Sequence, residues 1–280
     1  MIRLIAFDFD GTICARKQPF DEVMGDYLRR WKSMGIETVI ASGRPFRSLK
    51  RELSSFQEEI TIISNNGNLI RCKNSEKTLD KTIFDKQAIR PLVEVIESRG
   101  LHPIFHVDSY SKGYDLVTLH EMTDREKSYV VFYENMYRKM PLEEVEQEDV
   151  LAVAGYTTED VFDSIIREPV IKEGGLTAHL LKSRDATLSL FEIIGKGSDK
   201  WRGLKSYGKR KNIAPEDMLV VGDDRNDGGM IAHAGIGIAM ASAPEDVQAL
   251  ADIICREKPE DYGAFKLVDA IVEKEAGYEH

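Results

Sequence analysis

The chain lacks long apolar runs and is poor in cysteine and tryptophan. Its 280 residues include three cysteines and two tryptophans. Cys14, Cys72 and Cys255 do not stand in the spacing of a zinc or redox site, so we expect reduced thiols and a cytoplasmic protein. No apolar stretch reaches the roughly 18 residues of a membrane-spanning helix. The short run before Asp8 also argues against a signal peptide.

Positive charge is also in short supply. Lys and Arg number 38 against 48 Asp and Glu, which gives a formal net charge of −10. This balance argues against a nucleic-acid or anionic-membrane partner, because such proteins carry a basic surface. It is compatible with a small anionic substrate, which a few lysines, backbone amides and a metal ion can bind. We expect a monomer or a weak homodimer.

Strands and helices alternate at both ends of the chain. Apolar runs predict buried strands at 2–7, 38–41, 60–63, 218–221 and 236–240. Helical spacing predicts helices at 21–33, 46–56, 201–211, 227–234, 244–251 and 264–273. This alternation is typical of an α/β fold, and we predict a Rossmann-like, doubly wound core built on a parallel sheet.

The middle of the chain has a different pattern. It predicts helices at 86–99, 124–138 and 158–167, and strands at 103–107, 115–119, 150–156, 177–182 and 187–193. The acidic run 143–149 is expected to be solvated. We therefore predict a catalytic core formed by residues 1–79 and 190–280, and an inserted α+β cap domain formed by residues 80–189.

Two acidic residues close the first predicted strand, in Asp8-Phe9-Asp10-Gly11-Thr12. Residues i and i+2 of a strand point to the same side, so Asp8 and Asp10 should face one site. Neighbouring carboxylates repel each other unless a cation intervenes, and hard oxygen ligands select magnesium. A strand followed by an ordinary Asp-Gly turn is the alternative explanation of this motif taken alone.

A second acidic motif, Gly222-Asp223-Asp224-Arg225-Asn226-Asp227, follows the predicted strand at 218–221. Open α/β sheets bind ligands at the carboxyl ends of their strands, where this loop is expected to lie. The alternative is a loop that uses Asp and Asn as helix caps. One cap needs one acid, whereas this loop has three acids and an asparagine.

Two weaker signals point to an anion. Ser42-Gly43-Arg44 stands between a predicted strand and a predicted helix, where a hydroxyl and backbone amides favour phosphate. A plain N-cap explains it equally well. Lys200, at the start of a predicted helix, could neutralise a phosphate if it is buried, although most lysines at such a place are solvated.

The six histidines form no convincing cluster. His102 and His106 are four residues apart, but they lie around a predicted strand, so we expect no helical metal pair. His179 and Arg184 belong to the predicted cap strands or their turn, and they are weaker candidates for substrate contact.

The four motifs together resemble those of the haloacid dehalogenase-like hydrolase superfamily: DxDGT, Ser-Gly, Lys and GDxxND, in this order. The insertion between the second and third motifs is similar to a C2B cap, as in the Cof-type branch. Two positions depart from the family pattern. Ser242 stands where an Asn is common, and Gln248 where a Lys is common.

The resemblance implies a role for each matching residue. Asp8 would be the nucleophile that forms an aspartyl-phosphate, and Asp10 the general acid and then the base. Mg²⁺ would be bound by Asp8, the backbone carbonyl of Asp10, and Asp223. The implied phosphate-binding residues are Ser42, Gly43, Lys200, Asn226 and Asn66, the last followed by Gly67, and Asp227 would support the metal shell.

The function implied is a magnesium-dependent phosphatase that hydrolyses a small phosphorylated metabolite, such as a sugar phosphate. The cap would close over the core and set substrate specificity. A phosphomutase that uses the same aspartate is an alternative. A non-catalytic sensor of phosphorylated ligands is another, but it would not need Asp8, Asp10, Lys200 and Asp223 all intact.

Overall fold

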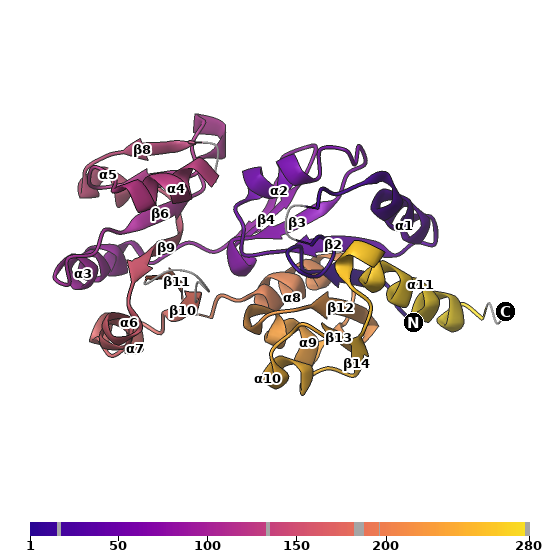
Figure 1. Ribbon diagram of the computed structural model, residues 1–280. Helices are drawn as coiled ribbons and strands as arrows, with labels where there is room; N and C mark the ends of the chain where they lie inside the picture. Colours follow the sequence, from indigo (N-terminus) through magenta and orange to yellow (C-terminus); the bar gives the residue numbers. More distant parts are fainter. Residues whose placement is uncertain (16–17, 133–134, 182–187, 196, 278–280) are drawn as a thin grey trace. The chain divides into compact units, whose positions relative to one another are not determined.

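The structure is a computed structural model that describes residues 1–15, 18–132, 135–181, 188–195 and 197–277 (Figure 1). The chain forms two compact units. The first consists of Met1–Lys81 and Asp199–His280, and the second of Thr82–Ser198. The predicted boundary at residue 190 falls inside strand β11 (Ser189–Ile194), and this whole strand belongs to the second unit.

The sheet of the first unit has the strand order β14-β13-β12-β1-β2-β3-β4-β5. From β14 to β3 all neighbouring strands pair in parallel, and β4 and β5 extend the sheet as an antiparallel hairpin. The strands are β1 (Leu4–Phe7), β2 (Glu37–Ala41), β3 (Thr61–Ser64), β4 (Leu69–Cys72), β5 (Thr78–Lys81), β12 (Met218–Gly222), β13 (Ile236–Met240) and β14 (Ile253–Cys255).

Helices cover both faces of this sheet because successive side chains of a strand point to opposite faces. Phe7 of β1 stacks on Trp31 and Phe265, whereas Leu4 packs in a core cluster with Leu204 and Met230. The helices are α1 (Glu22–Ser33), α2 (Phe46–Glu52), α8 (Lys200–Lys211), α9 (Gly228–His233), α10 (Glu245–Gln248) and α11 (Gly263–Glu275), with 3₁₀ turns η1 (Asn65–Gly67), η3 (Pro215–Asp217), η4 (Arg225–Asp227) and η5 (Pro259–Asp261). The predicted doubly wound α/β core is confirmed.

The second unit has a sheet of its own, in the order β10-β11-β9-β6-β7-β8. Its strands are β6 (Ile104–Val107), β7 (Leu116–Thr118), β8 (Tyr137–Lys139), β9 (Val150–Thr157), β10 (Thr177–Leu181) and β11. Its helices are α3 (Lys86–Glu97), α4 (Asp124–Phe132), α5 (Leu142–Val145), α6 (Glu159–Ile165) and α7 (Pro169–Lys172), with the 3₁₀ turn η2 (Tyr110–Lys112). The mixed α+β content of the insertion agrees with the prediction.

The core of the second unit lies on one face of its sheet. Phe105, Val153 and Phe191 of the strands pack there against Leu92 of α3 and Ile165 of α6. A smaller apolar cluster joins Ile104, Leu116 and Val130 of α4. This unit therefore buries a hydrophobic core independent of the first unit's sheet.

The predicted helix at 124–138 is wrong in its last part. Helix α4 ends at Phe132, and Tyr137–Lys139 forms β8, which pairs in parallel with β7. Asn135 has a φ of 56°, a left-handed conformation that an α-helix does not continue through. The hairpin β4–β5 and the short strand β14 were not predicted, because their sequences show no clean apolar alternation.

The acidic run 143–149 is not entirely solvated. Glu148 accepts hydrogen bonds from the hydroxyls of Ser109 and Tyr114, the latter at 2.7 Å, and from the ammonium of Lys112 at 2.9 Å. Its side chain is 11 % exposed. The prediction failed here because the partners of Glu148 stand far away in the sequence.

The three cysteines are free thiols. Burial raises the pKa of Cys14 to about 12, so its reactive thiolate is scarce at neutral pH.

Residues 182–187, which include the predicted contact residue Arg184, lie outside the described residues. Within the described ranges, no helix has both the length and the apolar character that crossing a bilayer requires.

His106 lies in the interior of the second unit. Its ring is buried, and Nε2 lies 2.8 Å from the hydroxyl of Tyr129. His102, four residues earlier in the sequence, lies elsewhere, with its Nδ1 3.2 Å from Oε1 of Glu126. His106 belongs to strand β6, and His102 precedes that strand. Burial lowers the pKa of His106 to about 4, so this ring stays neutral in the folded protein.

The second unit should lose stability as the pH falls below about 6.5, the pKa of an unperturbed histidine. The unfolded chain protonates His106 first, so the stabilising contribution is complete above that pH and declines towards pH 4. We expect a loss of about 2 kcal/mol between pH 7.5 and pH 5. This loss is measured by hydrogen exchange of the β6 amides at the two pH values, after correction for the pH dependence of the intrinsic exchange rates. In His106→Gln this part of the loss should disappear, and an unchanged loss would refute the assignment.

Candidate active site

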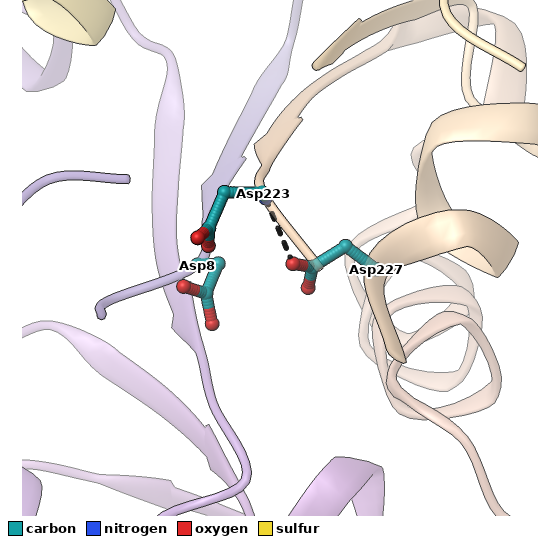
Figure 2. Close-up of side chains that lie close together, drawn as sticks. All are labelled: Asp8, Asp223 and Asp227. Carbon is teal, nitrogen blue, oxygen red and sulfur yellow. Dashed lines mark hydrogen bonds between the residues drawn. The ribbon is translucent and has the colours of Figure 1, made fainter. Parts of the chain in front are cut away.

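Three carboxylates meet at the carboxyl ends of two neighbouring strands. Asp8 follows β1, and Asp223 and Asp227 follow β12, which pairs with β1 through Phe7 and Val221. One oxygen from each carboxylate lies within 4.8 Å of the other two. Figure 2 shows the three side chains grouped together. Parallel strands end at the same edge of a sheet, which is why acids more than two hundred residues apart come together.

Lys200 neutralises part of this cluster. Its Nζ donates to Oδ1 of Asp8 at 2.6 Å and to Oδ1 of Asp227 at 2.7 Å, and the side chain is 1 % exposed. Helix α8 holds it there, with Asp199 as its N-cap. Burial disfavours the ammonium charge, but attraction to Asp227 and Asp8 outweighs burial and raises the pKa of Lys200. The lysine is therefore a permanent cation.

One buried cation does not balance three carboxylates. Burial raises the pKa of Asp8 well above its ordinary value, against the attraction of Lys200, and the neighbouring Asp227 and Asp223 raise it further. Burial and Asp227 raise the pKa of Asp223 to about 6. Hard oxygen donors that carry excess negative charge fit a divalent cation such as Mg²⁺. The donor set therefore suits the metal that the motifs predict.

Asp227 is held in place by its own loop. Its Oδ2 accepts backbone N–H groups of Asp223 at 3.0 Å and Asp224 at 3.1 Å, the first drawn dashed in Figure 2. Its Oδ1 accepts from Lys200. Because both oxygens of Asp227 already accept hydrogen bonds, its role is to orient the loop and the lysine. Asp8 and Asp223 have more lone pairs left than Asp227 with which to bind a cation.

Gly11 allows the two acidic motifs to approach each other. A Cβ at this position would lie 2.3 Å from Oδ2 of Asp223, closer than atoms can pack. Its φ of +85° is also a conformation that favours glycine. The next residue, Thr12, donates its hydroxyl to Oδ1 of Asp223 at 3.2 Å. This turn therefore positions the carboxylate of Asp223.

The polar residues predicted to bind phosphate also gather in the first unit. Ser42 follows β2 and is buried, and its hydroxyl accepts the backbone N–H of Arg44 at 3.1 Å. A Cβ on Gly43 would lie 3.3 Å from the Asn66 side chain, and Asn66 Oδ1 accepts from Nδ2 of Asn226 at 3.0 Å. The structure thus brings together the loops that follow β2, β3 and β12.

The turn that carries Asn66 has an unusual backbone. Asn65 and Asn66 have φ values of 50° and 51°, and Gly67 has 95°. A Cβ on Gly67 would lie 2.0 Å from the carbonyl oxygen of Asp199, immediately before Lys200. Strained backbone of this kind is frequent at functional sites. Here it lets the turn pack directly on the start of α8.

The side chain of Asp10 is not part of the carboxylate cluster. It is 50 % exposed, and Arg44 binds both of its oxygens, through Nε at 2.7 Å and Nη2 at 2.5 Å. The Arg44–Asp10 pair and the Thr12–Asp223 hydrogen bond were not predicted. All four residues stand inside recognised motifs, but no sequence pattern tells which carboxylate the side chain of Arg44 or Thr12 will contact.

The two departures from the family pattern lie in helix α10 and in the loop that precedes it. Nε2 of Gln248 donates to the carbonyl oxygens of Ala241 at 3.1 Å and Ala243 at 2.8 Å, and so ties down the loop after β13. Ser242 is an exposed residue of that loop. In the second unit, His179 of β10 stands opposite Glu192 of β11.

Asp223→Asn is expected to stabilise the metal-free protein. In the folded state Asp223 must ionise beside other buried acids, so its raised pKa means that stability falls as the pH rises from about 4 to about 6 and stays reduced at pH 7. Asparagine removes that charge and can still accept from Thr12. We expect a gain of about 1–2 kcal/mol in urea unfolding with EDTA.

The same variant should respond little to magnesium, whereas the wild type should be stabilised by it. Fluorescence of Trp31 and Trp201, both in the first unit, reports the transition. A less stable variant in EDTA would contradict this account of the charge balance.

The chain is similar to known proteins over nearly its whole length. Residues 5–266 match the family model for haloacid dehalogenase-like hydrolases. The 5-amino-6-(5-phospho-D-ribitylamino)uracil phosphatase YbjI of Escherichia coli is 24% identical over 287 residues, covering 99% of each chain. A phosphoglycolate phosphatase of Methanopyrus kandleri is 26% identical over 257 residues, covering 91% of this chain and 90% of its own.

Solved structures give the same result for the fold. A phosphatase of the haloalkanoate (HAD) superfamily from Bacteroides thetaiotaomicron superposes with a TM-score of 0.78 at 21% sequence identity, over 96% of this chain and 95% of its own. The similarity extends over nearly the whole of both chains. As predicted from its motifs, the chain belongs to the haloacid dehalogenase-like hydrolase family.

Proposed function

We propose that the protein is a magnesium-dependent phosphatase that hydrolyses a small phosphorylated metabolite through an aspartyl-phosphate on Asp8. The observation that carries this proposal is the cluster of Asp8, Lys200, Asp223 and Asp227, in which Asp223 is half-buried and the other three are buried. A nucleophilic carboxylate and a fixed cation lie there within 2.6 Å of each other, in a donor set suited to a divalent ion.

The reaction has two steps. In the first, a carboxylate oxygen of Asp8 attacks phosphorus, the bond from phosphorus to the leaving oxygen breaks, and Asp10 gives its proton to that oxygen. In the second, Asp10 takes a proton from water, the water oxygen bonds to phosphorus, and the bond to Asp8 breaks. The covalent intermediate divides one slow hydrolysis into two easier steps.

The remaining residues balance and orient charge. Lys200 offsets the negative charge of the phosphoryl oxygens, and the Ser42 hydroxyl, the Gly43 amide and the amides of Asn66 and Asn226 donate hydrogen bonds to them. Mg²⁺, held by Asp8, the carbonyl of Asp10 and Asp223, would supply further stabilisation of developing charge when bound. Asp227 holds Lys200 and the loop after β12 in place through its hydrogen bonds to both.

The substrate class rests on the relatives. Those named above are phosphatases whose names specify small phosphorylated metabolites, and one structurally similar protein is described as a sugar phosphatase. We propose a substrate of this size, with a sugar phosphate as one candidate, and specificity residues in the second unit. The free cysteines are compatible with a cytoplasmic protein that acts as a monomer or weak homodimer.

A phosphomutase is the alternative that uses the same aspartate. It would return the phosphoryl group from Asp8 to another hydroxyl of the substrate in place of water. Isomerised product without free phosphate would identify it. An intact nucleophile and cation in one cluster, with the proton shuttle Asp10 two residues after the nucleophile, favour either enzyme over a phospho-ligand sensor.

The test is phosphate release from a panel of sugar phosphates, nucleotides and cofactor phosphates, with Mg²⁺ and with EDTA. The proposal expects release from small substrates that depends on the metal and is lost in EDTA. Sugar monophosphates are also followed by NMR for isomerisation. A folded, metal-binding protein that releases phosphate from none of them would refute the phosphatase.

A further inference from the structure

Arg44 makes a contact that the proposed roles leave unexplained. Its guanidinium binds the carboxylate of Asp10 with two parallel hydrogen bonds, Nε to Oδ2 at 2.7 Å and Nη2 to Oδ1 at 2.5 Å. Such a two-point pair fixes direction as well as distance, because the planar fork matches the carboxylate plane. It acts on the side chain that must move a proton in both steps.

Arg44 itself is held from several sides. Its Nη1 lies 3.2 Å from Oε1 of Glu52, and the guanidinium lies 5.4 Å from the centre of the Phe9 ring. Its backbone N–H donates to the Ser42 hydroxyl at 3.1 Å, and its carbonyl accepts from the N–H of Asn65 at 3.1 Å. The residue is therefore anchored to both the phosphate-binding loop and the turn after β3.

The two partners differ in their freedom. The side chain of Arg44 is 20 % exposed and that of Asp10 is 50 % exposed. The arginine is the fixed member of the pair, and the aspartate is the member that is open to solvent. A fixed cation beside a proton-transferring carboxylate sets where that carboxylate points before the substrate arrives.

We infer that Arg44 is a positioning residue that orients Asp10 for proton transfer to the leaving oxygen and from the attacking water. This inference rests on the proposed phosphatase function. It predicts that the loss caused by removing Arg44 depends on how much the leaving group needs a proton. An alkyl phosphate needs one, whereas p-nitrophenolate is a stable anion that leaves without it.

The experiment compares wild type and Arg44→Gln on an alkyl phosphate and on p-nitrophenyl phosphate, each at saturating Mg²⁺. We expect kcat/KM, which reports the steps up to departure of the leaving group, to fall at least about tenfold on the alkyl phosphate and to change by no more than about twofold on the aryl phosphate. Arg44→Lys keeps the positive charge but not the planar fork. Its activity on the alkyl phosphate should lie between that of the wild type and that of Arg44→Gln.

Two further variants complete the design. Arg29→Gln is the matched control, because Arg29 also pairs with carboxylates and lies over an aromatic ring, Phe56, away from the site. It should leave kcat/KM unchanged on both substrates. In an Asp10→Asn background, Arg44→Gln should have no further effect on the alkyl phosphate, since neighbours that act as a unit are not additive.

The outcomes separate the two claims. Equal losses of kcat/KM on both substrates, or an effect of Arg44→Gln that persists in Asp10→Asn, would overturn the positioning role while leaving the phosphatase intact. A wild type that shows no magnesium-dependent release from either substrate would overturn the phosphatase, and the inference with it. Thermal unfolding of each variant verifies that it is folded.

Discussion

Replacing Asp8 with asparagine is expected to reduce magnesium-dependent phosphate release by at least about a thousandfold. The amide has nearly the same shape as the carboxylate, but it is not a nucleophile and cannot form the acyl-phosphate. Lys200 keeps its bond to Asp227, so the fold should survive. The variant also removes a buried negative charge, and it should be at least as stable as the wild type in EDTA.

The control for this variant is Asp246→Asn. Asp246 is an exposed carboxylate that pairs with Arg225 of η4 at 2.9 Å, so it lies on the neighbouring α10 without joining the cluster. Its replacement should leave the rate within about twofold of wild type. The comparison is made on whichever substrate of the panel is hydrolysed fastest. An Asp8→Asn protein that retained more than a tenth of the wild-type rate would exclude Asp8 as the nucleophile.

Lys200→Met is expected to cause the largest loss of stability. Methionine has a similar volume, but it leaves Asp8 and Asp227 buried without their cation. Removing one partner of a buried ion pair typically costs about 3–5 kcal/mol. Urea unfolding at pH 7 in EDTA, followed by tryptophan fluorescence, measures the loss. Mg²⁺ should restore part of the stability, because it supplies positive charge to the same carboxylates.

Lys211→Met is the control on the same helix. Lys211 pairs with Glu37 at 2.8 Å, and both side chains are more than a third exposed, 41 % and 37 %. Exposed pairs contribute little, so we expect a loss of less than about 1 kcal/mol. Equal losses for the two lysines would mean that the burial of Lys200 has no energetic consequence, which contradicts the charge balance described here.

The sequence allowed much of the core and the identity of its site residues to be predicted. Apolar runs such as 218–221 mark strands buried on both faces, and the loop after this strand carries more acids than the capping of one helix needs. The grouping of Asp8 with Asp223 followed from parallel strands that end at one edge. The charge-balancing role of Lys200 was predicted through the family resemblance, since its helix looks polar in isolation and most lysines at such a place are solvated.

Other features depended on tertiary contacts that local patterns do not encode. Strand β8 forms because β7 offers an edge, although its residues Tyr137–Lys139 are all exposed. The Arg44–Asp10 pair joins two motifs that were each recognised, but only the fold shows which acid the arginine reaches. Glu148, predicted to be solvated, found partners in η2 and the residues beside it.

The most direct test of the account is to trap the intermediate. Wild-type protein is mixed with excess substrate and Mg²⁺, quenched in acid within the first turnover, digested and analysed by mass spectrometry. The account predicts one phosphoryl group on the peptide that contains Asp8, labile to hydroxylamine and absent from Asp8→Asn. Turnover without any phosphorylated peptide, or with the phosphoryl group on another residue, would contradict an aspartyl-phosphate on Asp8.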